Sequence, residues 1–116
     1  MAASILIVDD EKNIRTTLTD ILEEEGCEVL AASTGEQAVK LCERRRFDVV
    51  LLDVRMPGID GIEALRRIRR QRDGVKVILM SAYGVGQVER TAIEEGAIAF
   101  MRKPLDIRRI IELIRS

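Results

Sequence analysis

The chain has 116 residues, of which 47% are hydrophobic and 34% charged, and its net charge is −1. This length suits one domain with a substantial core, and the composition is typical of a globular protein in water. The near-neutral charge argues against a general role in binding nucleic acid or a membrane surface. No apolar run approaches the ~20 residues of a membrane-spanning helix, and residues 1–4 do not resemble a signal peptide, so we expect a cytoplasmic protein.

Cys27 and Cys42 are the two cysteines, and the chain has no histidine. Without a CxxC motif or a histidine, an ordinary zinc site is not expected, and the thiols are expected to be reduced and packed as small apolar groups. The absence of histidine also removes the usual general base for a serine or cysteine nucleophile, which argues against a hydrolase triad.

Apolar runs that suit strands alternate with helical patterns along the chain. The predicted strands are 5–8, 28–32, 49–52, 75–80 and 97–101. The five intervening and following helices carry apolar faces at Ile14, Leu18, Ile21 and Leu22; at Ala38, Val39, Leu41 and Cys42; at Ile62, Leu65 and Ile68; at Val88, Ala92 and Ile93; and at Ile107, Ile110, Ile111 and Ile114.

Local signals mark several of the helix ends. Gly26 and Gly96 are expected to end the first and fourth helices, and the segment 83–86 is expected to be a loop. Two pairs have the spacing of a capping box before the second helix, Ser33 with Glu36 and Thr34 with Gln37. The fourth helix has the thinnest apolar stripe, so we expect it to be the most mobile.

Five alternations of strand and helix with short connections predict an α/β fold with a parallel sheet and helices on both faces. The most apolar strands, 5–8, 49–52 and 77–80, should be central. Right-handed crossovers then favour the strand order 2-1-3-4-5, and residues 1–116 should form one domain.

The third helix carries a run of arginines on its outer face. These residues are Arg66, Arg67, Arg69, Arg70 and Arg72. A basic run can bind nucleic acid, but no aromatic residue is interleaved here, so we interpret the run as a solvated helix face and expect no direct nucleic-acid binding.

Polar residues follow the strands at the edge where the predicted sheet reverses its order. Asp9 and Asp10 follow the first strand, Asp53 ends the third and Ser81 follows the fourth, while Lys103 follows the fifth. Because ligands bind at this edge of an open parallel sheet, the five side chains should form one site. The plainer alternative, that Asp53 is only a polar turn residue, does not explain this convergence.

Three close carboxylates repel one another unless a cation joins them, and their hard oxygens suit Mg²⁺. The cluster therefore predicts phosphoryl chemistry, with Asp53 as the nucleophile and Mg²⁺ on Asp10 and Asp53. Asp9 would act directly or through water, Lys103 would pair with phosphoryl oxygens, and Ser81 would donate a hydrogen bond to one of them.

The chain resembles a bacterial response-regulator receiver domain over nearly its whole length. The matching segments are 5–10 with the acidic pair, 51–53 followed by 56–61, Ser81-Ala82 and Lys103-Pro104. The resemblance implies a flavodoxin-like fold and a phosphoryl group passed to Asp53 from a sensor histidine kinase or histidine phosphotransferase.

The same resemblance implies further roles for single residues. The backbone carbonyl of Arg55 would be a Mg²⁺ ligand beside Asp9, Asp10 and Asp53. Ser81 would turn toward the phosphoryl group while Phe100 rotates inward, and the Lys103-Pro104 peptide would be cis.

The chain departs from the family pattern at its switch position. Phe100 replaces a more familiar tyrosine, so its ring has no hydroxyl to hydrogen-bond, and a role as a plain core residue remains open. Arg55 and Tyr83 lie where the family tunes the lifetime of the phosphoryl group, and Arg55 either shields that group or attracts a partner.

Three functional hypotheses follow. In the first, the chain is a phospho-acceptor that catalyses only its own phosphorylation and dephosphorylation. An aspartate-nucleophile phosphatase is the second, but Arg55 stands where such enzymes have a general acid. A docking module that ignores phosphorylation is the third.

By resemblance, the partner kinase or phosphotransferase would dock over Ile14, Leu18 and the strand-end loops. The face formed by the fourth helix, fifth strand and fifth helix would carry an output partner or a homodimer. The segment Ser81-Ala82-Tyr83-Gly84 resembles both single-domain relay proteins and nitrogen-regulation-type receivers.

Overall fold

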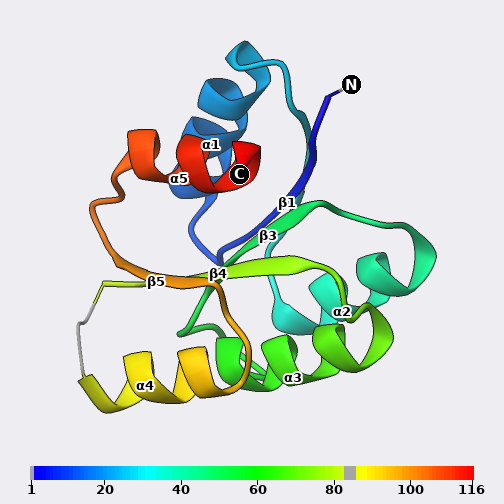
Figure 1. The fold of residues 1–116 in the computed structure, drawn as a ribbon, viewed down its shortest axis with the longest axis vertical. Coiled ribbons are helices and arrows are strands. Elements are labelled where there is room, and N and C mark those ends of the chain that lie inside the picture. Colours follow the sequence, from blue (N-terminus) through cyan, green and yellow to red (C-terminus); the bar gives the residue numbers. More distant parts are fainter. Residues whose placement is uncertain (1, 83–85) are drawn as a thin grey trace.

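A computed structural model describes residues 2–82 and 86–116 (Figure 1). The strands are β1 (Ser4–Val8), β2 (Glu28–Ala32), β3 (Val49–Asp53), β4 (Lys76–Ser81) and β5 (Ala99–Arg102). The helices are α1 (Lys12–Glu24), α2 (Gly35–Arg44), α3 (Gly61–Gln71), α4 (Gly86–Glu94) and α5 (Ile107–Arg115). None of these described helices has the length and apolar character to cross a membrane.

The five strands form one parallel sheet in the order β2-β1-β3-β4-β5, which confirms the predicted topology. The central strands β1 and β3 are apolar along their length because helices cover both faces of the sheet, and their aliphatic residues are fully buried. β2 lies at an edge and leaves Leu30 38% exposed. The order of the strands reverses between β1 and β3, so these two strands flank the switch point.

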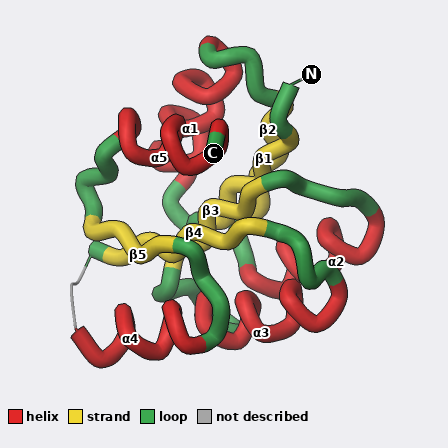
Figure 2. Tube along the Cα trace, viewed as in Figure 1, coloured by secondary structure: helices red, strands yellow, loops and turns green. Residues whose placement is uncertain are grey.

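Figures 1 and 2 show α1 and α5 on one face of the sheet and α2, α3 and α4 on the other. Alternate residues of each strand supply the two cores, as the pleat requires. On β1, Ile5 and Ile7 pack with Leu18, Leu22 and Ile110 of α1 and α5. The opposite core contains Leu6, Val8, Val50, Leu52, Ala38, Leu65 and Ile68.

Glycines in the left-handed conformation end α1 and α4, as predicted. Gly26 has φ 87° and Gly96 has φ 102°. After Gly96, the Ala97 N–H donates to the Ala92 carbonyl at 3.0 Å, and the Gly96 N–H donates to the Ile93 carbonyl at 3.0 Å. These bonds satisfy the last carbonyls of α4 and make Ala97 part of the helix end.

This helix end corrects the prediction of a strand over 97–101, because β5 begins only at Ala99. Ala97 is buried for packing below the end of α4 and not because it belongs to the sheet. The fourth strand also differs from the predicted range 75–80, since it runs from Lys76 and includes Ser81.

One of the two possible capping pairs is formed at α2. The Thr34 hydroxyl accepts a hydrogen bond from the Gln37 N–H at 3.1 Å, and the Gln37 side chain accepts one from the Ser33 N–H at 2.9 Å. Glu36 does not cap the helix and instead accepts a hydrogen bond from the Ile59 N–H, at 3.2 Å. The Thr34–Gln37 pair is therefore the correct alternative.

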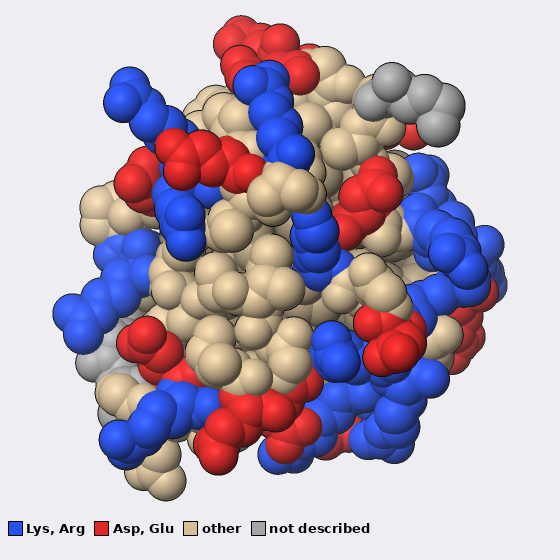
Figure 3. Space-filling model, viewed as in Figure 1, with Lys and Arg blue, Asp and Glu red and all other residues tan. Residues whose placement is uncertain are grey.

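Lys and Arg side chains gather over α2 and α3, at the lower right of Figure 3. Arg66, Arg67 and Arg70 of the predicted basic face are exposed. Arg69 and Arg72 are only half-exposed: Arg72 donates to the Cys42 carbonyl at the end of α2, at 3.0 Å, and Arg69 donates to the Gly96 carbonyl. The basic run thus includes structural contacts as well as solvated side chains.

α4 buries one residue, Ala92, within its described length. Polar contacts from α3 reach its C-terminal end: the Arg66 guanidinium lies 3.1 Å from the Glu95 carboxylate, and Arg69 donates to the Gly96 carbonyl at 3.3 Å. The thin apolar stripe predicted for this helix is confirmed. Its mobility stays a prediction.

Candidate functional site

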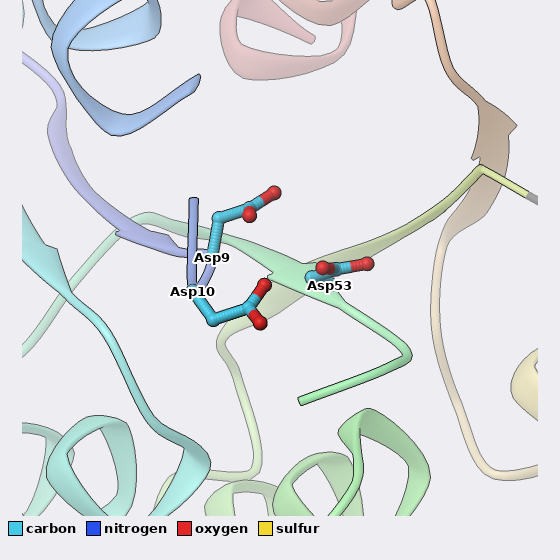
Figure 4. Close-up of side chains that lie close together, drawn as sticks. All are labelled: Asp9, Asp10 and Asp53. Carbon is cyan, nitrogen blue, oxygen red and sulfur yellow. The ribbon is translucent and has the colours of Figure 1, made fainter. Parts of the chain in front are cut away.

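The acidic residues predicted to form one site lie together at the carboxyl ends of β1 and β3. Figure 4 shows Asp9 and Asp10 extending from the end of β1 and Asp53 from the end of β3. One carboxylate oxygen from each of the three residues lies within 4.8 Å of the others. Asp9 is fully buried, Asp53 is 5% exposed and Asp10 is exposed, so the cluster opens to solvent on the Asp10 side.

Lys103 joins this cluster from the segment after β5. Its ammonium group lies 2.7 Å from the Asp9 carboxylate and 3.5 Å from the Asp53 carboxylate. Only 13% of its side chain is exposed. The ammonium group is thus nearer to Asp9 and remains within reach of a group added to Asp53.

The charges at the site act strongly on one another because they are buried. Burial and the negative charge of Asp9 raise the pKa of Asp53 from 3.8 to about 6, although Lys103 and a backbone hydrogen bond from Arg55 act in the opposite direction. Burial would lower the pKa of Lys103, but its bonds to Asp9 and the charge of Asp53 outweigh burial and raise it. A divalent cation would offset the remaining excess of negative charge.

The segment after β3 packs closely against the backbone of the site. The Gly61 N–H donates to the Val54 carbonyl at 2.8 Å, and a Cβ at Gly61 would lie 2.4 Å from the Asp53 carbonyl oxygen. Asp60 caps α3 by accepting a hydrogen bond from the Glu63 N–H at 2.9 Å. A glycine is therefore required where α3 begins directly behind Asp53, and the loop that carries Arg55 is held at both ends.

The other predicted site residues lie near the same edge. Ser81 is buried at the end of β4, and its carbonyl accepts a hydrogen bond from the Lys103 N–H at 2.8 Å. Phe100 is partly buried and packs on the core beneath α3 and α4. The Lys103-Pro104 peptide bond is cis, as the resemblance implies. Of the predicted loop 83–86, residues 83–85, including Tyr83, lie outside the described residues, and Gly86 corrects the prediction because it is the first residue of α4.

The two cysteines lie away from this cluster and are free thiols, as predicted. Burial raises the pKa of Cys42 to about 11, despite the nearby Arg72. Burial also raises the pKa of Cys27. A raised pKa keeps a thiol protonated and unreactive, which suits the predicted packing role.

Sequence reasoning missed two contacts that support the site. The Arg15 guanidinium donates to the Asp9 carbonyl at 2.8 Å, and Glu36 accepts the Ile59 N–H from the loop after β3. The signal for Arg15 is a basic residue in the first turns of α1, directly after an acidic pair. Glu36 gives no such signal, because its spacing from Ser33 also matches a capping box.

A family model described as the response regulator receiver domain matches residues 5–115. The chain belongs to this family. It is therefore a phospho-acceptor domain of the two-component type, a class that is phosphorylated on an aspartate with Mg²⁺. Receiver domains interact with histidine kinases or phosphotransferases.

Known proteins resemble this receiver domain along its full length. Sporulation initiation phosphotransferase F of Bacillus subtilis is 38% identical over 116 residues, which cover all of this chain and 94% of that protein. The response regulator protein FleR of Pseudomonas aeruginosa is 36% identical over 98% of this chain, but the match spans 24% of its length. The chain thus corresponds to nearly all of one relative and to about a quarter of another.

Solved structures share the fold. A CheY-like receiver domain protein from Methanospirillum hungatei has a TM-score of 0.94 and 32% identity, with 99% of this chain and 92% of that chain covered. The response regulator TrrA of Thermotoga maritima, solved in complex with Mg²⁺ and BeF, has a TM-score of 0.87 and 36% identity, with 99% and 97% covered.

The residues present fit the metal that receiver domains bind. Asp9, Asp10 and Asp53 offer hard carboxylate oxygens within 4.8 Å of one another, and this donor set suits Mg²⁺ better than a softer metal. The exposed side of Asp10 also leaves room for water or phosphate oxygens.

Proposed function

We propose that Asp53 accepts a phosphoryl group from a phosphohistidine of a sensor histidine kinase or histidine phosphotransferase. The main observation in support is that carboxylate oxygens of Asp9, Asp10 and Asp53 lie within 4.8 Å of one another. The Lys103 ammonium lies 2.7 Å from the Asp9 carboxylate and 3.5 Å from the Asp53 carboxylate. We also propose that residues 1–116 act as one receiver domain.

In the transfer, a carboxylate oxygen of Asp53 attacks phosphorus. The P–O bond forms as the P–N bond to the donor imidazole breaks, and the imidazole nitrogen keeps the electron pair. Phosphoryl transfer is mainly positioning and charge stabilisation, so the burial of Asp53 and the nearby ammonium of Lys103 are the main contributions of the chain.

Asp9, Asp10, Asp53 and the backbone carbonyl of Arg55 would hold Mg²⁺, which offsets charge on the transferring group. Asp9 already uses one oxygen to accept the Glu11 N–H at 2.9 Å and the other to pair with Lys103, so it contributes charge directly or through water. Asp10 is the more accessible ligand.

The signal would leave the site through Ser81 and Phe100. Ser81 lies in β4 beside the strand that ends in Asp53, and Phe100 lies on β5 against the core beneath α4. A hydrogen bond from the Ser81 hydroxyl to the phosphoryl group would pull the end of β4 inward. Phe100 would then rotate, changing the face formed by α4, β5 and α5, which would bind an output partner or a second copy.

An apolar groove beside the site would receive the donor. The groove has a volume of about 420 Å³ and runs between α1 and the segment after β5. Its lining includes Ile14, Leu18, Lys103, Pro104 and Leu105. The groove is lined by Ile14 and Leu18 and reaches Lys103 of the site, which supports the docking position expected from the sequence.

Intact-mass measurement after incubation with Mg²⁺ and a small phosphodonor tests the proposal. The wild-type chain should gain one phosphoryl group, and Asp53→Asn should gain none. Asp20→Asn, at an exposed position on α1, is the matched control and should behave as wild type. Equal labelling of Asp53→Asn would refute the assignment, and steady release of phosphate from varied monoesters would favour a phosphatase.

A further inference from the structure

Asp9 is buried, and each of its polar groups has a partner. Its N–H donates to the Ala32 carbonyl at 3.2 Å, and its carboxylate accepts the Glu11 N–H at 2.9 Å and the Lys103 ammonium at 2.7 Å. Its carbonyl accepts a hydrogen bond from the Arg15 guanidinium at 2.8 Å. The carbonyl therefore depends on a side chain of α1 and not on a neighbouring strand.

This carbonyl belongs to the peptide unit that joins Asp9 to Asp10. A peptide unit is planar, so a bond that fixes the carbonyl of Asp9 also fixes the direction from which the backbone of Asp10 continues. Among the described residues, Asp10 has no side-chain hydrogen bond or ion pair, so its carboxylate is aimed by its backbone. The contact made by Arg15 thus acts on the orientation of Asp10.

Arginine suits this task because its guanidinium is planar and always charged, and a charged donor makes a strong hydrogen bond to a buried carbonyl. Arg15 is half-buried in the first turns of α1, which limits its freedom to move. Its positive charge has an opposite effect, because a cation near the cluster repels Mg²⁺. The two effects of Arg15 on metal affinity therefore differ in sign and can be separated.

We infer that Arg15 is a positioning residue for the metal site: it holds the Asp9 carbonyl and thereby aims the Asp10 carboxylate toward Asp53. The inference rests on the proposed Mg²⁺ site. It adds a residue that does not touch the metal and that lies one helix turn beyond the acidic pair. Because supporting residues of metal sites alter affinity by about tenfold or more, the effect of Arg15 should be measurable.

Titration of the metal-free protein with Mg²⁺ alone, followed by the backbone amide signals of Asp10 and Asp53 in two-dimensional NMR, tests the inference. Arg15→Met removes the hydrogen bond and the charge and should weaken Mg²⁺ affinity about tenfold. Arg15→Lys keeps the charge and a donor and should give an affinity between those of wild type and Arg15→Met. Arg44→Met, at the opposite end of the sheet, is the control and should bind as wild type.

An unchanged Mg²⁺ affinity in Arg15→Met would overturn the inference, because a residue that only stabilises the fold would alter the melting temperature and not the affinity. A tighter affinity would also overturn it, because Arg15 would then act only by repelling the metal. The NMR spectrum also reports whether each variant is folded. If Arg15→Met does not fold, Arg15→Lys decides: a weaker affinity than wild type supports the inference and an equal affinity overturns it. A wild-type protein that binds no Mg²⁺ would instead overturn the proposed function, and the inference with it.

Discussion

Replacing Asp53 with asparagine should stabilise the metal-free protein. Asp53 is 5% exposed, and its burial together with the negative charge of Asp9 raises the pKa of its carboxyl group to about 6. A carboxyl group whose pKa is raised in the folded state opposes folding when it is ionised. Asparagine has nearly the same shape without the charge, and Lys103 keeps its closer partner, Asp9.

The size of the effect follows from the pKa values. The pKa of Asp53 rises from 3.8 to about 6, and each unit corresponds to about 1.4 kcal/mol, so ionisation opposes folding by up to about 3 kcal/mol above pH 6. The loss of the weaker bond to Lys103 reduces this gain, so we expect about 1–3 kcal/mol for Asp53→Asn. For a chain of this length, that corresponds to a rise of roughly 4–12 °C in Tm.

Thermal unfolding followed by circular dichroism in the presence of EDTA measures the difference. The difference in Tm between Asp53→Asn and wild type should be largest above the pKa of Asp53 in the folded protein and should shrink as the pH falls through about 6. It should vanish near the ordinary value of 3.8, where Asp53 binds a proton in both the folded and the unfolded state. Asp20→Asn removes one exposed carboxylate and should change Tm little. Added Mg²⁺ should stabilise wild type more than Asp53→Asn. A Tm in EDTA for Asp53→Asn equal to or below that of wild type would refute the electrostatic argument.

Two further substitutions test the architecture of the site. Gly61→Ala should lower the free energy of unfolding, measured by denaturant titration, by at least about 1–3 kcal/mol, because its Cβ would lie 2.4 Å from the Asp53 carbonyl oxygen. The control is Gly74→Ala, whose Cβ would have no atom within 4 Å and which should be neutral or slightly stabilising. Lys103→Met leaves the buried Asp9 carboxylate without its cation and should destabilise the protein at neutral pH by roughly 3 kcal/mol. Since the pKa of Lys103 is raised, wild type keeps this stabilisation until the pH exceeds the ordinary lysine value of 10.5, and the difference between the two proteins should shrink above that pH. Denaturation at several pH values would contradict the second prediction if Lys103→Met matched wild type at neutral pH.

The fold could be predicted because its signals are local and repeated. Continuous aliphatic runs such as 49–52 suit strands covered on both faces, and the glycines that end α1 and α4 act through their own φ angles. The start of β5 could not be predicted in this way. Ala97 is as apolar as a strand residue, but its N–H bonds to the end of α4, and an apolar pattern does not distinguish these two kinds of burial.

The grouping of Asp9, Asp10, Asp53 and Lys103 could also be predicted, because it follows from strand order and from the ends of the strands. The contact of Arg15 could not, since it depends on the reach of a long side chain across the turn between β1 and α1. The partly buried position of Phe100 on the core suits a core residue as well as a switch.

The weak attachment of α4 has a consequence for the energy of local opening. Ala92 is its one buried residue and Val88 packs partly buried against the core, while surface contacts from α3, such as those of Arg66 and Arg69, hold the segment at its C-terminal end. Such contacts lose strength in salt, whereas the packing of β1 and β3 does not. The backbone amides of α4 should therefore exchange with solvent through a low-energy opening that leaves the central sheet protected, so this side of the domain can rearrange without global unfolding.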